Sequence, residues 1–163
     1  RYDTTTGRAI HIEDRIGFLD RKLRIVNENT CNREDWFDAA VTAYQTSRAY
    51  EWQGDNLLLA RESLLYTFID NYEYKFGERP DHELVRDIAD IISWNVWQMD
   101  GLKGVIPNSC HDVENRNLYG EIERTPCPGC KTNNIHNHNG IPVLLKAFSS
   151  GNTYPFHLLS KKR

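Results

Sequence analysis

The sequence lacks both a long apolar run and a signal-like start. None of its segments approaches the roughly 20 consecutive apolar residues that a membrane-spanning helix needs. Residues 1–7 (RYDTTTG) carry no apolar core of the kind found in secretory signal peptides. We therefore expect no membrane partner and a cytoplasmic location.

The sequence also lacks an excess of charge of either sign. The 20 Lys and Arg residues nearly balance the 23 Asp and Glu residues, and the formal net charge is -3. This balance excludes the global basic excess that is typical of nucleic-acid-binding proteins, so any contact with DNA would depend on a local basic surface. The basic residues 161–163 can touch phosphate, but three terminal charges are expected to form a solvated tail.

Cysteine is infrequent as well, with 4 in 163 residues. So few cysteines do not make a dense disulfide framework in a chain of this length, so reduced thiols are expected. The chain is long enough for one real hydrophobic core and short for two. We expect an α/β domain in residues 1–107 and an irregular Cys/His-containing segment with late strands in residues 108–163, packed on the same domain.

Secondary-structure patterns are clearest in residues 49–106. A short aromatic strand at 49–52 precedes a helix with a wide apolar stripe at 57–75. A second helix begins at Asp81, and a second strand lies at 95–99. Strand, helix, helix, strand is the order of a crossover between parallel strands. The pattern predicts an α/β fold with a Rossmann-like three-layer sheet, complete or partial.

Two acidic residues stand at the ends of these strands. Glu51 lies at the end of the first strand and Asp100 follows the second, and ligands of parallel α/β sheets bind beyond the carboxyl ends of the strands. A carboxylate there can accept both hydroxyl protons of a ribose, and an Asp on the next strand can accept a hydrogen bond from an adenine amine. Trp52 offers a flat surface for a purine. The alternative is that both acids are simply solvated and that Trp52 belongs to the core.

The stretches around these residues carry a resemblance to a known family. Segments 49–56 (AYEWQGDN), 60–62 (ARE) and 95–102 (NVWQMDGL) resemble the AdoMet-dependent N6-adenine DNA methyltransferases of bacterial restriction-modification systems. Segment 17–23 (GFLDRKL) is more loosely similar, so the resemblance covers residues 17–106. It implies a methyltransferase-type α/β fold, S-adenosyl-L-methionine as the cofactor and DNA as a partner.

The same resemblance implies roles for individual residues. Glu51 stands at the position that holds the AdoMet ribose, and Trp52 stands at the neighbouring position that contacts the adenine. Asp100, followed by Gly101, stands at the position that binds the adenine amine. These four residues are the candidate cofactor-binding set.

Two departures from the family pattern bear on activity. Residues 12–17 (IEDRIG) stand where the family has its glycine-rich cofactor loop. The Asn/Asp-Pro-Pro-Tyr/Phe motif that holds the flipped adenine is absent, so no catalytic residue is assigned and enzymatic activity is left open. Three interpretations remain: part of a larger methyltransferase; one chain of a split enzyme whose partner carries the catalytic and target-recognition parts; or a diverged, non-enzymatic protein of phage or mobile-element origin with a binding or inhibitory role.

A separate motif lies in the polar segment 108–139. Cys127 and Cys130 form a C-x-x-C with Pro and Gly between them, a turn often seen in zinc sites. Cys110 upstream and either His136 or His138 downstream would complete a tetrahedral set of zinc ligands, which would make the segment a small zinc-stabilised binding module. The alternatives are a redox-active pair or free thiols in a surface loop.

Overall fold

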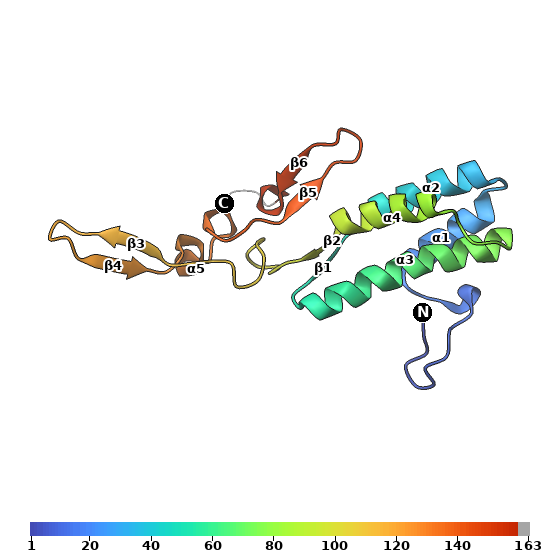
Figure 1. The fold of residues 1–163 in the computed structure, drawn as a ribbon, viewed down its shortest axis with the longest axis horizontal. Helices are drawn as coiled ribbons and strands as arrows, with labels where there is room; N and C mark the ends of the chain where they lie inside the picture. The colour runs from blue at the N-terminus through green and yellow to red at the C-terminus, as the bar shows by residue number, and fades with distance from the viewer. Residues whose placement is uncertain (160–163) are drawn as a thin grey trace. The chain divides into compact units, whose positions relative to one another are not determined.

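The computed structural model describes residues 1–159, and the predicted solvated tail at 161–163 lies outside them. The chain divides into two compact units (Figure 1). Unit 1 comprises residues 1–49 and 58–96, and unit 2 comprises residues 50–57 and the chain from 97 onward. Residues 97–107 belong to unit 2.

Unit 1 is helical. Its elements are η1 (Ile12–Asp14), α1 (Phe18–Asn29), α2 (Arg33–Gln45), most of α3 (Gly54–Phe76) and α4 (His82–Asn95). α1 is amphipathic, and the residues that it buries lie on one face at helical spacing: Leu19, Leu23 and Val26. α2 begins at Asn32, whose side chain accepts the N–H of Asp35 as an N-cap.

Aromatic residues make the centre of the unit 1 core. Trp36 on α2 is completely buried, and its ring contacts the rings of Phe68, Tyr72 and Phe76 on α3 at centroid distances of 5.4–5.8 Å. These are the tilted and edge-to-face geometries that aromatic pairs prefer. The wide apolar stripe predicted for the long helix therefore packs against α2, mainly through the carboxyl-terminal half of α3.

A chain of buried polar groups crosses the same core. The indole Nε1 of Trp36 donates to Asn27 Oδ1 at 2.7 Å, and Asn27 Nδ2 donates to Asn71 Oδ1 at 3.0 Å. Asn71 Nδ2 then donates to the backbone oxygen of Thr67 at 2.8 Å. Each of these donors has an acceptor, so hydrogen bonds compensate the cost of removing the polar groups from water. The same bonds link α1, α2 and α3.

Unit 2 is built of short strands and loops. Its core consists of Met99, Val105, Val143 and Leu145, each no more than 4% exposed, together with Cys127. The hairpin β5–β6 (Leu144–Lys146 and Thr153–Pro155) and the hairpin β3–β4 (Val113–Arg116 and Ile122–Thr125) are both antiparallel. The remaining elements are α5 (Pro128–Thr132), η2 (Ile135–Asn137) and η3 (Phe156–Leu159).

Strands β1 (Ala49–Glu51) and β2 (Val96–Gln98) pair in a sheet of their own. The N–H of Met99 donates to the backbone oxygen of Glu51 at 2.9 Å, so the carboxyl ends of both strands meet at the same edge. The order strand, helix, helix, strand predicted for residues 49–106 is the order that the structure has, with β1, α3, α4 and β2.

The predicted mixed α/β class is confirmed at this level. Within residues 1–159 every sheet has two strands, so the described chain does not show a Rossmann-like three-layer sheet. The segment 108–139, for which no regular structure was predicted, contains the β3–β4 hairpin. Its strands are exposed on both faces, so they lack the alternation of apolar and polar residues by which a strand is predicted. No helix in the described part of the chain is both long and apolar enough to cross a membrane.

Candidate metal centre

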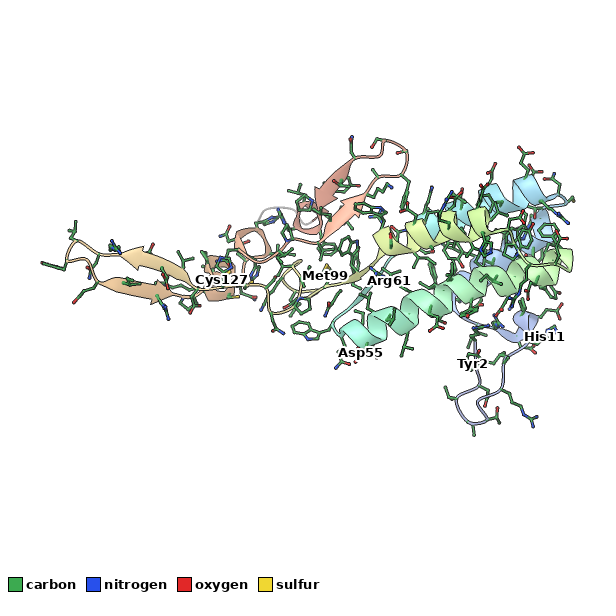
Figure 2. All side chains as sticks on the ribbon, viewed as in Figure 1. Tyr2, His11, Asp55, Arg61, Met99 and Cys127 are labelled. Carbon is green, nitrogen blue, oxygen red and sulfur yellow. The ribbon has the colours of Figure 1, made fainter. Side chains whose placement is uncertain are left out.

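Four side chains of unit 2 converge at the base of the β3–β4 hairpin. They are Cys110, Cys127, Cys130 and His138, and their ligand atoms all lie within 4.8 Å of one another. Cys110 precedes β3 by three residues, and Cys127 follows β4 by two (Figure 2). The hairpin is therefore held at both of its ends by residues of the cluster.

The distances match tetrahedral zinc. Sγ of Cys110, Cys127 and Cys130 lies 3.5, 3.8 and 3.7 Å, respectively, from Nδ1 of His138. Zn–S bonds of about 2.3 Å and Zn–N bonds of about 2.0 Å at tetrahedral angles place sulfur and nitrogen about 3.5 Å apart. All three distances are within a few tenths of an ångström of that value, so the four ligand atoms are already spaced for one metal ion.

Local sequence shapes the C-x-x-C part of the cluster. Cys127 is the N-cap of the short helix α5, and Pro128 occupies the first helical position. A backbone N–H at that position has no acceptor within the helix, so proline loses no hydrogen bond there. Gly129 is required by close packing. A Cβ atom there would lie 2.5 Å from the backbone nitrogen of His138 and 2.6 Å from its Cγ. Only glycine lets the His138 ring approach the two thiols.

A second set of contacts fixes the segment that carries Cys110. Asn139 Nδ2 donates to the backbone oxygen of His111 at 2.8 Å, and the N–H of His111 donates back to Asn139 Oδ1 at 3.2 Å. Gly140 packs against Ser109, whose Oγ would lie 2.5 Å from a Cβ at that position. Residues 109–111 and 138–140 thus lie side by side, and this brings Cys110 and His138 together although they are 28 residues apart in the sequence.

Electrostatics distinguishes the thiols. Burial raises the pKa of the Cys110 thiol to about 11, and the neighbouring Cys127 and Cys130 thiols add to the rise. Burial also acts to raise the pKa of Cys127. Backbone N–H groups of Asn139 and Cys130 outweigh that effect, with help from the His138 ring, and lower the Cys127 pKa to about 6. Cys127 is thus more readily available than Cys110 as a thiolate, which is the form that binds metal.

A cation lies near this cluster. Burial acts to lower the pKa of Lys103, but the thiolates of Cys130 and Cys110 and the carboxylate of Asp100 outweigh it, and the pKa is raised. Three thiolates and one neutral imidazole around Zn²⁺ carry a net charge of -1. The Lys103 ammonium, which is attracted to Cys130 and Cys110, carries a charge of the opposite sign.

The structure resolves which histidine joins the cysteines. His138 lies in the cluster, whereas the ring of His136 lies edge-to-face against His157 at a centroid distance of 5.7 Å. Both ring nitrogens of His136 are buried and have no hydrogen-bond partner within the described residues. Spacing from the C-x-x-C motif gave no basis for this choice, because both histidines are close enough in the sequence to reach the thiols.

The four candidate cofactor-binding residues lie elsewhere in unit 2. Glu51 is half-buried, and its carboxylate accepts the N–H of Gln53 at 3.0 Å. Asp100 is only 4% exposed; its carboxylate accepts the N–H of Leu102 at 3.0 Å and lies 3.5 Å from Lys103 Nζ. Gly101 is an exposed turn residue. Glu51 and Asp100 share one edge of the β1–β2 sheet, but the Asp100 carboxylate is engaged in its own turn.

Trp52 is 48% exposed and borders an open cleft. Gln98 also lines this cleft, and its Nε2 donates to the backbone oxygen of Trp52 at 3.0 Å. The cleft has a volume of about 460 Å³ and is lined by Trp52, Gln53, Gly54, Asp55, Gln98, Pro107 and Asn108. Sequence reasoning identified Trp52 but missed Gln98 and Asn108, because they come from segments that only the fold brings together.

Comparison with protein-family models, with curated proteins and with solved structures gives no match for this chain. The site is therefore interpreted from its own geometry.

Proposed function

We propose that unit 2 is a zinc-stabilised binding module, with Zn²⁺ held by Cys110, Cys127, Cys130 and His138. The observation that carries the proposal is the set of three sulfur–nitrogen distances, 3.5–3.8 Å, which match three of the six edges of a ligand tetrahedron around zinc. Four protein ligands leave no open coordination position, so the metal has a structural role and activates no water.

The need for a metal follows from how little else holds this part of the chain. Nearly every residue of the β3–β4 hairpin is exposed, and a two-stranded hairpin alone is only marginally stable in water. Zinc binding would join residues 110, 127–130 and 138 and would supply folding free energy directly. The surrounding polar loops would then be ordered without a larger apolar core.

Metal analysis tests this proposal. Protein purified without chelator should contain one zinc ion per chain, and Co²⁺ substitution should give the thiolate charge-transfer bands of a tetrahedral site. Cys130→Ser and His138→Ala should lose the metal, whereas Cys31→Ser and His111→Ala, which change an exposed thiol and a neighbouring imidazole outside the cluster, should retain it. Metal-free protein, or equal loss in the control variants, would overturn the assignment.

We infer a second candidate function from the β1–β2 edge, namely binding of the adenosine part of S-adenosyl-L-methionine by an N6-adenine DNA methyltransferase-like domain of a restriction-modification system. In its favour, Glu51 and Asp100 lie at one strand edge, and the exposed Trp52 ring borders a cleft of about 460 Å³. In this function Glu51 would hold the ribose diol, Trp52 would stack on the adenine, and Asp100, followed by Gly101, would accept a hydrogen bond from the adenine amine.

This second function assigns the catalytic and target-recognition parts to another segment or chain, and the three-layer methyltransferase sheet would likewise be completed there. DNA would be the substrate of the assembled enzyme. Within this chain, the engaged carboxylate of Asp100 leaves Glu51 and Trp52 as the residues that contribute most to affinity.

Calorimetry tests cofactor binding by the chain itself. S-adenosylhomocysteine should bind, and Glu51→Gln and Trp52→Ala should each weaken binding roughly tenfold, the size expected for one charge-assisted hydrogen bond or one stacking contact. Glu62→Gln is the matched control, because Glu62 is an exposed acidic residue of α3. This variant should bind S-adenosylhomocysteine as tightly as the unmodified chain does. Absence of binding at millimolar ligand would exclude this function for the isolated chain.

A further inference from the structure

The β3–β4 hairpin has an open edge along β3. Among residues 1–159, β3 pairs only with β4. The N–H of Asn117 donates to the backbone oxygen of Glu121 at 3.0 Å, and bonded and non-bonded pairs alternate along an antiparallel ladder. From the register, Asn115 and Val113 therefore bond to β4, whereas the backbone groups of Glu114 and Arg116 point away from it. Two N–H groups and two carbonyls are thus presented on one edge.

We propose that this edge is a self-association surface, on which the β3 strands of two copies of the chain pair antiparallel about a twofold axis at Asn115. In that register Glu114 of one copy lies opposite Arg116 of the other, and both are residues whose backbone groups point outward. Each of the two symmetric pairs exchanges two backbone hydrogen bonds. The product is a four-stranded sheet with β4 at each outer edge.

Charge complementarity favours a second copy as the occupant. Each oppositely charged pair, Glu114 with Arg116 of the other copy, occurs twice because the interface is twofold. Arg116 is exposed and has no ion-pair partner within the described chain, so it is available for this contact. Glu114 already accepts from Arg124 at 2.9 Å, so pairing would place this carboxylate between two guanidinium groups.

Side-chain charge also disfavours self-association through the β4 edge and binding of nucleic acid to the hairpin. The outward-pointing residues of β4 are Ile122 and Arg124, and a twofold pairing there would set an apolar side chain opposite a charge. Nucleic acid is also disfavoured, because residues 113–125 contain three acidic and two basic side chains.

The turn of the hairpin supports pairing with a like hairpin. Leu118 and Tyr119 at the tip are 102% and 90% exposed, and the turn is closed by Asn117 Oδ1, which accepts the N–H groups of both Tyr119 and Glu121. A pairing centred on Asn115 sets the tip of each hairpin beside the base of the other. The other copy would then lie next to both exposed apolar side chains.

Sedimentation velocity of the whole, zinc-loaded chain over a range of concentrations tests the proposal. The unmodified chain should show a reversible monomer–dimer equilibrium. Arg116→Glu and Glu114→Arg should each weaken self-association roughly tenfold or more, because two attractive pairs become two repulsive ones. An equimolar mixture of the two variants should form a heterodimer, since every opposed pair is then of opposite sign. Glu123→Arg, a reversal on the same hairpin away from the outward-pointing positions, should dimerise normally.

The zinc content of each variant separates this proposal from the metal site. A chain that binds one zinc ion and stays monomeric at all concentrations would overturn the self-association surface and leave the metal site intact. A dimer that survives both charge reversals, or variants that fail to associate when mixed, would assign self-association to another surface. A chain that dimerises and is purified without chelator yet contains no zinc would overturn the metal site alone.

Discussion

At the scale of single residues, glycine and histidine positions decide the geometry of the cluster. The His138 ring can approach the thiols only because Gly129 has no side chain. The short distances from a Cβ at residue 129 to the atoms of His138 leave no room for one. The two atoms nearest to a Cβ at that position are a backbone nitrogen and a ring carbon. The backbone nitrogen cannot move without shifting the chain that carries the ligand.

Gly129→Ala should therefore weaken zinc binding by roughly tenfold or more, the size of effect that a displaced ligand shell produces. Gly101→Ala is the matched control, because a Cβ there meets no atom within 4 Å and the residue has no positive φ. Competition with a chromophoric chelator measures both affinities. Equal affinity in the two variants would mean that the His138 approach is not limited by residue 129.

Tyr44 shows how burial sets a pH dependence in unit 1. Burial raises the pKa of its phenol well above the ordinary value, and the charges of Asp20 and Asp70 raise it further. The raised folded-state pKa means that the neutral phenol stabilises the fold fully below about pH 10, the unfolded value, and that this stabilisation is lost as the pH rises toward the folded pKa.

Tyr44→Phe should remove that alkaline loss. At neutral pH the variant should be about 1 kcal/mol less stable, because the phenol donates to the backbone oxygen of Leu64 at 2.8 Å. Urea unfolding followed by helical circular dichroism from pH 7 to 11 gives both quantities. If the free energy of unfolding of Tyr44→Phe falls above pH 10 as steeply as that of the unmodified chain, another group causes the alkaline loss of stability.

At the scale of elements, one series of side-chain hydrogen bonds joins the three helices α1, α2 and α3. Asn71 on α3 is 1% exposed, accepts from Asn27 on α1, and donates within its own helix. Trp36 on α2 joins the line through the same Asn27. The helices are therefore held in register by hydrogen bonds as well as by ring packing.

Asn71→Leu should cost about 1–3 kcal/mol of the free energy of unfolding although leucine has the same branched shape, because the half-buried Asn27 amide loses its acceptor. Asn29→Leu, at an exposed position of α1 whose amide donates to its own helix, should change stability by less than about 0.5 kcal/mol. Chemical denaturation of both variants measures the difference. A neutral Asn71→Leu would show that water can satisfy the site.

At the scale of the whole molecule, the two units are stabilised by different means. Unit 1 has an aromatic and aliphatic core that contains none of the metal ligands, whereas the base of the β3–β4 hairpin in unit 2 is formed by all four. Removal of the metal should therefore affect the units unequally.

A strong chelator should abolish the hydrogen-exchange protection of amides near the cluster and in β3–β4 while the helical circular dichroism of unit 1 is largely retained. Added zinc should restore the protection. The Cys31→Ser chain should respond identically, since this exposed thiol is not in the cluster. Cooperative unfolding of all helices on chelation would show instead that the two units fold as one.

Apolar periodicity along the sequence determined the elements of residues 49–106, and the C-x-x-C motif determined two of the four cluster residues, Cys127 and Cys130, because both signals are local. The hairpin β3–β4 was not predictable in this way, since strands that face water on both sides show no alternation. Turn signals were present in Asn117 and Gly120, the latter at a φ of 84° that suits glycine.

Only the tertiary structure decided between His136 and His138, and it did so through Gly129 and the side-by-side course of residues 109–111 and 138–140. It likewise brought Glu51 and Asp100 to one edge while engaging the Asp100 carboxylate in a turn. These outcomes depend on contacts between residues far apart in the chain. Sequence spacing limits which residues can meet, and packing selects which of them do.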